Sequence, residues 1–177
     1  MSEPTSGPEA SAAGPDAPVV ELLRVDWSDP RAARLRDEMD SEMGLLYAGR
    51  MFGAGEALEA AVHAALAIDE TTIVTSVLAI LGGRAVGHAG IRRYDDAFEV
   101  RKVVVEPGAR GLGLSKALMA ELEVIAREHG VTRLLLQTGD LQREAIGLYE
   151  RIGYHRVPVY GGYGAIPGAI CYEKILR

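Results

Sequence analysis

The chain has 177 residues, of which 48% are hydrophobic and 25% are charged, and its formal net charge is −6. A chain of this size and average soluble composition is expected to form one globular domain, which excludes a disordered, fibrous or membrane-spanning protein. The acidic balance, with no cluster of lysine or arginine, argues against nucleic acid or anionic lipid as a partner, and the single cysteine excludes an internal disulfide.

Residues 1–18 are rich in serine, glycine, proline, alanine and acidic residues. Such a composition buries too little apolar surface to offset the loss of chain entropy, so it predicts a flexible tail. The segment also lacks the basic start and apolar centre of a signal peptide, which favours a cytoplasmic protein. We therefore expect residues 19–177 to form the single domain.

The first structured segments alternate between strand and helix signals. Residues 19–25 (VVELLRV) predict a strand, and residues 28–49 predict a helix. Ser28 or Asp29 is the expected N-cap of that helix, because Pro30 suits the first helical position. A second helix is expected over residues 56–69, after a glycine-containing connection.

Three strands and a long helix are expected next. Residues 72–83 and 84–94 read as strands joined by two glycines, which favours a tight hairpin turn. A third strand over residues 97–107 ends at Pro107. Apolar residues at helical spacing follow from Leu114 to Ile125, and Gly130 is the expected end of that helix.

The remaining segments predict a strand, a helix and two more strands, at residues 132–138, 142–153, 154–160 and 169–176. The complete order is typical of an α/β fold with a mixed, mostly antiparallel central sheet flanked by helices. The helix after residue 114 is expected to cross over between two parallel strands.

A glycine-rich segment between a strand and a helix is the first candidate for a ligand site. The P-loop pattern fails there because Leu114 stands in the lysine position, and the dinucleotide fingerprint fails because Lys116 replaces its last glycine. The pattern R-G-x-G-x-S over Arg110–Ser115 fits a loop whose backbone N–H groups and helix dipole bind a pyrophosphate. A turn that only connects two elements is the alternative. The residues of the predicted pyrophosphate loop are Arg110, Gly111, Leu112, Gly113, Leu114 and Ser115.

Two segments together resemble the acetyl-CoA-binding half of the GNAT superfamily of N-acetyltransferases. They are FEVRKVVVEPGARGLGLSKALMAELE, residues 98–123, and LQTGDLQREAIGLYERIGYHRVPVYGGY, residues 136–163. The resemblance covers about Phe98 to Leu176 and is much weaker before Thr71. Ser115 stands where the family usually has glycine or alanine, and Gln142 stands where it often has asparagine.

The resemblance implies a layout for the domain. The strands at 100–105 and 133–138 would splay apart, with acetyl-CoA bound mainly by residues 98–176 and the acceptor mainly by residues 19–70. The backbone N–H and C=O groups of Val103 and Val105 would pair with the pantetheine arm like an added strand, and one of these amides, or that of Val104, would polarise the thioester carbonyl. Gln142 would join the cofactor-binding residues.

Two residues are the candidates for acid–base chemistry. Tyr149 matches the tyrosine of the family's A-x-x-L-Y motif, the usual general acid, and an ordinary core tyrosine is the alternative. Glu99 is the candidate general base, because family members often carry an acid at that place beside the thioester. A solvated carboxylate, or one paired with Arg101 on the same strand face, are the alternatives for Glu99.

No metal site is expected. The four histidines, His63, His88, His129 and His155, are scattered without the spacing of metal ligands, and Cys171 lies in an apolar strand where it reads as a core residue.

The sequence therefore predicts an N-acetyltransferase that moves an acetyl group directly from acetyl-CoA to a primary amine in a ternary complex. A non-catalytic acyl-CoA-binding regulatory domain and a transferase for longer acyl groups are the alternatives. The acceptor, a small-molecule or peptide amine, would be selected by Met39–Gly55 and Tyr160–Pro167. The sequence is also compatible with a homodimer and does not specify the oligomeric state. Four acidic residues near the first of these segments either attract a cationic acceptor or are simply solvated: Asp37, Glu38, Asp40 and Glu42.

Overall fold

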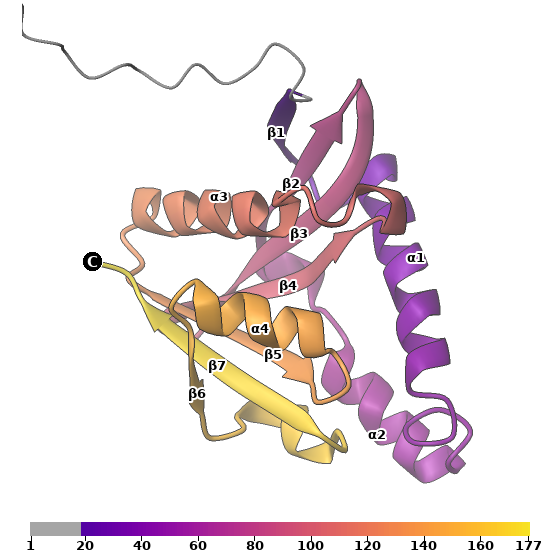
Figure 1. Ribbon diagram of the computed structural model, residues 1–177. Helices are drawn as coiled ribbons and strands as arrows, with labels where there is room; N and C mark the ends of the chain where they lie inside the picture. The colour runs from indigo at the N-terminus through magenta and orange to yellow at the C-terminus, as the bar shows by residue number, and fades with distance from the viewer. Residues whose placement is uncertain (1–18) are drawn as a thin grey trace, which may run out of the picture.

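A single seven-stranded sheet runs through the computed structural model, which describes residues 19–177 (Figure 1). The tail predicted for residues 1–18 lies outside the described residues. The strands are β1 (Val20–Val25), β2 (Ile73–Leu81), β3 (Arg84–Tyr94), β4 (Ala97–Val105), β5 (Arg133–Gly139), β6 (His155–Val157) and β7 (Ala169–Ile175). The helices are α1 (Pro30–Leu46), α2 (Glu56–Leu66), α3 (Leu114–Glu128) and α4 (Arg143–Arg151), with 3₁₀ turns η1 (Glu70–Thr72), η2 (Pro107–Ala109) and η3 (Gly161–Ala165).

The strands follow the order β1-β2-β3-β4-β5-β7-β6, and every neighbouring pair is antiparallel except β4 and β5. The α3 crossover joins these two parallel strands, as predicted. They pair only from Phe98↔Leu134 to Val100↔Leu136. Beyond Val100 the two strands separate, which confirms the expected splay in a mostly antiparallel sheet.

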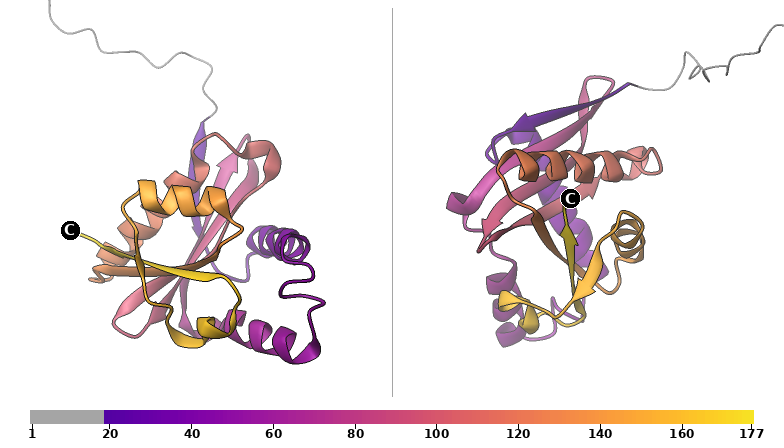
Figure 2. Two further views of the ribbon diagram at one scale, coloured as in Figure 1. Left: turned by 60° about the horizontal axis from the view of Figure 1, so that its bottom comes forward. Right: turned by 90° about the vertical axis from the view of Figure 1, so that its left-hand side faces the viewer.

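Helices cover both faces of the sheet. Helices α3 and α4 lie on one face, while α1 and α2 lie on the other (Figure 2). Helix α3 buries an apolar stripe against the sheet, and each fully buried leucine in it contributes about 1.5–3 kcal/mol. The buried side chains of the stripe are Leu114, Leu118, Met119, Leu122, Ile125 and Ala126.

Local sequence signals set several element boundaries. Gly82 and Gly83 both have positive φ, 56° and 77°, as the tight turn between β2 and β3 requires. The Asp29 side chain accepts a hydrogen bond from the backbone N–H of Arg31, so Asp29 is the N-cap of α1 and Pro30 its first residue. Gly130, with φ 70°, follows the end of α3.

Several elements are shorter than predicted, and for two of them the structure shows the reason. The strand expected over residues 154–160 is only His155–Val157, because Pro158 has no N–H to continue the ladder. Helix α2 ends at Leu66 rather than at residue 69, since Asp69 caps η1 instead by accepting from the N–H of Thr71 at 3.0 Å.

In the part of the chain from residue 19 onward, no helix is long and apolar enough to cross a membrane.

Candidate active site

A cavity of about 540 Å³ opens where β4 and β5 separate. Its walls come from α1 and the following turn, from α2, from β4 and β5, and from α4 and η3. Both segments expected to select the acceptor line it, the first through Met39, Met43, Tyr47 and Met51 and the second through Tyr163 and Ile166. The splay of the sheet is thus the feature that makes room for a ligand.

Tyr149 of α4 lies in the wall of this cavity. Its ring is 6% exposed and packs against the rings of Tyr154 and Tyr172, with centroids 6.0 and 6.1 Å away. Burial raises the pKa of Tyr149, so the phenol keeps its proton at neutral pH. Its hydroxyl makes no hydrogen bond among residues 19–177, which leaves a neutral donor at the cavity wall.

Glu99 lies behind the cavity and does not line it. Its side chain is fully buried, so the alternative of a solvated carboxylate is wrong. Oε2 accepts from Nε of Arg92 at 2.6 Å and lies 3.4 Å from a guanidinium nitrogen of Arg101. Oε1 accepts from the hydroxyls of Tyr160 at 2.8 Å and Tyr163 at 2.6 Å. The ion pair with Arg101 that the strand alternation suggested is therefore present.

Tyr163 connects this buried carboxylate to the cavity, because it lines the cavity and also donates to Glu99. A guanidinium nitrogen of Arg101 donates to the same hydroxyl oxygen. Burial raises the pKa of both Tyr160 and Tyr163, so both phenols are neutral donors to Glu99. The network fixes η3 against β4, on the side of the cavity opposite α4.

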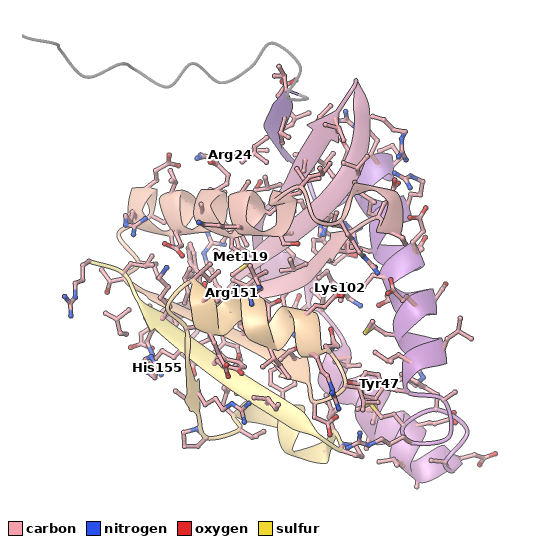
Figure 3. All side chains as sticks on the ribbon, in the orientation of Figure 1. Arg24, Tyr47, Lys102, Met119, Arg151 and His155 are labelled. Atoms are coloured by element: carbon pink, nitrogen blue, oxygen red, sulfur yellow. The ribbon has the colours of Figure 1, made fainter. Side chains whose placement is uncertain are left out.

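A β-bulge in β4 interrupts the strand at the cavity. The pairing of β3 with β4 shifts register between His88 and Gly90, and Lys102 has a φ of 53°, a conformation that is uncommon for a residue other than glycine. The bulge ends the regular alternation of side chains, so the four consecutive residues 100–103 all line the cavity. Lys102 reaches into the space between β4 and α1, where it pairs with Asp40 (Figure 3).

His88 holds this bulge from within the core. Its ring is fully buried, with Nδ1 2.7 Å from the carbonyl oxygen of Lys102 and Nε2 3.1 Å from the Ser76 hydroxyl. A carbonyl can only accept, so Nδ1 carries the proton and Nε2 accepts from Ser76. Burial, assisted by the positive charges of Arg36 and Lys102, lowers the pKa of His88 to about 4.

The buried imidazole should make the stability of the fold depend on pH. The unfolded chain binds a proton on His88 below pH 6.5, whereas the folded protein resists protonation until about pH 4. The contribution of His88 to the free energy of unfolding is therefore complete above pH 6.5. It is lost as pH falls from 6.5 to 4, by about 1.4 kcal/mol per pH unit. Urea unfolding of the wild type and of His88→Gln at a series of pH values should show this slope only in the wild type. The exposed His155 is the matched control, and a His155→Gln variant that loses the slope instead would contradict the assignment.

The predicted pyrophosphate loop follows β4 and η2. Gly111 and Gly113 have φ values of 82° and 76°, and Gly113 is the N-cap of α3 without any side-chain hydrogen bond to the helix. The first N–H groups of α3 are therefore free of a side-chain cap and point out of the helix end. Leu112 is half-exposed, whereas the side chain of Leu114 is buried in the core, so Leu114 offers only its backbone to a ligand. Ser115 is partly exposed in the first turn.

Arg110 points away from the helix end and toward α1. Its Nε donates to the carbonyl of Val105 at 3.0 Å, and a terminal nitrogen donates to Glu42 at 2.7 Å. The carbonyl of Val105 thus already has one donor. Along residues 101–105, the edge of β4 that faces β5 has no partner strand, and the backbone groups of Val103 and Val105 lie on it, because those of Val104 point toward β3.

Two residues at the end of β5, Thr138 and Gly139, were not identified from the sequence, whereas Gln142 was. The Thr138 side chain is 3% exposed, and its hydroxyl has no hydrogen-bond partner among the described residues. A Cβ at Gly139 would clash with the Tyr47 hydroxyl, which accepts from the N–H of Leu141 at 3.2 Å (Figure 3). Gln142 is the N-cap of α4 but does not cap it through its side chain, and it lines the cavity together with Tyr47 and Thr138.

The acidic residues of α1 are mostly paired with basic residues. Glu38 lies 2.6 Å from Arg34, Asp40 pairs with Lys102, and Glu42 pairs with Arg110. They therefore present less free negative charge to a cationic acceptor than the sequence suggested. Over residues 19–177, no three histidine, cysteine or acidic side chains lie close enough together to hold a metal ion.

The chain resembles known proteins in sequence. It is 37% identical over 78 residues to an IAA acetyltransferase from Azospirillum brasilense, a match that covers 44% of this chain and 51% of the relative. It is 35% identical over 95 residues to the N-alpha-acetyltransferase RimI of Mycobacterium tuberculosis, which covers 51% of this chain and 58% of the relative. The matches thus span about half the length of these curated relatives.

Its fold resembles solved structures over most of its length. A Klebsiella pneumoniae protein with the provisional name acyl-CoA N-acyltransferase superimposes with a TM-score of 0.71 at 24% identity, covering 89% of this chain and 98% of that one. The PaiA N-acetyltransferase of Thermoplasma acidophilum, solved in complex with coenzyme A, superimposes with a TM-score of 0.64 at 14% identity, covering 89% and 99%. The model of the Acetyltransferase (GNAT) family matches residues 22–154. This chain belongs to the GNAT family of acetyltransferases.

Proposed function

We propose that this protein is an N-acetyltransferase that moves the acetyl group of acetyl-CoA to a primary amine by direct attack within a ternary complex. The observation that carries the proposal is the neutral, hydrogen-bond-free phenol of Tyr149 in the wall of a cavity at the open edge of β4. Family membership and the coenzyme A complex of the similar Thermoplasma protein support it.

The residues present fit coenzyme A at three places. The free edge of β4 at Val103 and Val105 suits the amides of a pantetheine arm, which would add to the sheet like a short strand, with the amide of Val104 as a further candidate to polarise the thioester carbonyl. The loop Arg110–Ser115 and the uncapped end of α3 suit the pyrophosphate. The unpaired hydroxyl of Thr138 and the amide of Gln142, which lines the cavity, suit polar groups of the arm.

Acetyl-CoA, when bound, supplies a thioester whose acetyl carbon the amine attacks. As the carbon–nitrogen bond forms and the carbon–sulfur bond breaks, the sulfur needs a proton and the amine must lose one. Tyr149 is the proposed donor to sulfur, because burial keeps its phenol protonated and its hydroxyl has no competing acceptor in the fold. Its packing against Tyr154 and Tyr172 fixes the direction of donation.

Glu99 is the proposed final acceptor of the amine's proton, which reaches it through Tyr163. The hydroxyl of Tyr163 donates to Oε1 of Glu99 at 2.6 Å, and Tyr163 also lines the cavity. As the oxygen of Tyr163 takes a proton from the amine, it passes its own proton to Glu99. The number of hydrogen bonds in the network is unchanged by this transfer.

We expect Tyr163→Phe to lower kcat/KM by about 100-fold at neutral pH, the low end of what general-base assistance supplies. The defect should shrink as pH rises from 7 to 9.5, because more of the free amine is then neutral in solution. Initial rates of thiol release over this pH range provide the measurement.

Tyr160→Phe is the matched control for this experiment. Tyr160 donates to the same oxygen of Glu99 at 2.8 Å but does not line the cavity. Equal losses in the two variants, or a defect in Tyr163→Phe that does not change with pH, would mean that the network only supports the structure.

Two measurements test the proposed function as a whole. Calorimetry with acetyl-CoA reports binding, and thiol release with a panel of amines reports transfer. Tight binding without amine-dependent release would favour a non-catalytic acyl-CoA-binding domain. Preferred turnover of longer acyl-CoAs in competition with acetyl-CoA would favour the longer-chain alternative.

A further inference from the structure

The part of the cavity between α1, α2 and β4 is apolar and adaptable. It is lined mainly by methionine and other large apolar side chains: Met39, Met43, Met51, Phe52, Leu66 and Ile166. Methionine is unbranched and polarisable, so it can adjust to apolar groups of different shapes. This lining suits an acceptor with a compact apolar body.

The charged groups of the cavity do not suit a polycation. Asp40, Arg101 and Lys102 are the charged residues in its wall, so positive charge exceeds negative charge. The only carboxylate among them already pairs with Lys102. An acceptor with several ammonium groups would therefore meet a single carboxylate, whereas an acceptor's carboxylate can replace Asp40, the more exposed member of the pair, on Lys102.

Lys102 is held at the cavity by an unusual backbone. Its φ of 53° places a residue other than glycine in the left-handed region, and the buried ring of His88 fixes its carbonyl at 2.7 Å. Such a conformation costs free energy and is often retained at functional sites. Its consequence is that the ammonium group of Lys102 reaches the cavity next to Val103, where regular alternation would have separated neighbouring side chains.

We propose that the acceptor is a small primary monoamine that carries a carboxylate beside an apolar body, in the manner of an apolar α-amino acid, and that Lys102 receives the carboxylate. Asp40, whose side chain is 56% exposed, holds the Lys102 ammonium in the free protein and swings toward solvent when the acceptor's carboxylate replaces it. An amine must be uncharged to attack, so such an acceptor reacts with one net negative charge, which Lys102 balances. This inference rests on the proposed acetyltransferase function.

The test compares amines with and without a carboxylate, at pH 9.5, where the amine of an amino acid and that of its amide are both largely neutral. Thiol release from acetyl-CoA is measured with L-methionine, L-leucine and L-phenylalanine, with their amides, and with spermidine and an aminoglycoside. We expect the amino acids to be acetylated with a KM about tenfold lower than that of their amides, the size of one charge-assisted contact, and the polycations to be poor acceptors. Equal KM values for acid and amide in the wild type, or a preference for the polycations, would overturn the proposal.

Three variants separate a carboxylate contact from a general defect. Lys102→Met should raise KM for L-methionine about tenfold and leave that of methioninamide unchanged, which removes the difference between the two. Asp40→Asn should lower KM for L-methionine, because Lys102 loses its internal partner. Lys174→Met is the control, since Lys174 lies on β7 outside the cavity and pairs with Glu123 at 2.5 Å. A higher KM for L-methionine in Asp40→Asn would contradict the proposed replacement of Asp40.

Calorimetry keeps the failure of this inference distinct from failure of the proposed function. L-methionine and methioninamide are titrated into the protein with coenzyme A present, so that acceptor binding is read without turnover. A protein that binds acetyl-CoA but favours no carboxylate-bearing amine in either assay overturns the acceptor class alone. A protein that binds no acetyl-CoA overturns the proposed function and this inference with it.

Discussion

Replacing Tyr149 by phenylalanine is expected to lower kcat by about 100-fold, the smaller end of the range for a lost general acid, with little change in the affinity for acetyl-CoA. The substitution removes only the hydroxyl, and that group makes no hydrogen bond within the described fold. The packing with Tyr154 and Tyr172 should persist, so neither the helix nor the cavity wall is disturbed. The loss should therefore fall on the chemical step, where sulfur leaves without a proton.

Steady-state thiol release and calorimetry of acetyl-CoA on the same preparation provide the measurement. Tyr154→Phe is the matched control, because Tyr154 belongs to the same aromatic cluster, is buried, and has a hydroxyl without a partner, but does not line the cavity. Its kcat should stay at the wild-type value. Full turnover by Tyr149→Phe would remove the general-acid assignment, provided that pre-steady-state rates show that dissociation of the CoA product does not limit kcat.

The fold could be predicted wherever local signals agree with the tertiary structure. The Asp29 cap, the turn at Gly82 and Gly83, and the apolar stripe of α3 each specify an element through chemistry confined to a few residues. Pattern alone failed at β6, where the strand-like residues 154–160 contain Pro158, and it gave no signal for the short 3₁₀ turn η3. Short elements stabilised by remote contacts leave only a weak local signal.

The candidate site likewise contains residues that short motifs predict and residues that only distant contacts bring together. The predicted pyrophosphate loop and Tyr149 lie in short motifs, so their residues could be named from sequence. The surroundings of Glu99 could not, because its hydroxyl donors Tyr160 and Tyr163 are 61 and 64 residues away in the chain. The role of Lys102 at the cavity also depends on a bulge, and regular alternation would have put Arg101 and Lys102 on opposite faces. Tyr47 and Leu141 meet across 94 residues, a contact that no spacing rule indicates.

The double variant Gly111→Ala/Gly113→Ala is expected to weaken the binding of acetyl-CoA by about 100-fold. Both glycines have positive φ, and alanine in that conformation costs about 1–2 kcal/mol per residue, so two such residues account for a loss of this size. A Cβ at either position would meet no atom within 4 Å, so the strain is one of backbone conformation and not of packing. The free loop can relax to other conformations, and it must then recover the strained one in order to present its N–H groups to the pyrophosphate.

Gly108→Ala is the control within the same loop, because Gly108 also has open space around it but does not have a positive φ. Calorimetry should find its affinity for acetyl-CoA equal to that of the wild type. Acetyl-pantetheine, which lacks the diphosphate, should bind the double variant and the wild type equally, since the free edge of β4 is unaltered. If the double variant lost affinity for both ligands, its defect would lie in the cavity or the fold. If the double variant kept full affinity for acetyl-CoA, the diphosphate would have to bind elsewhere. A loop that no longer favours the left-handed conformation can direct consecutive N–H groups toward one anion only at a cost in binding free energy.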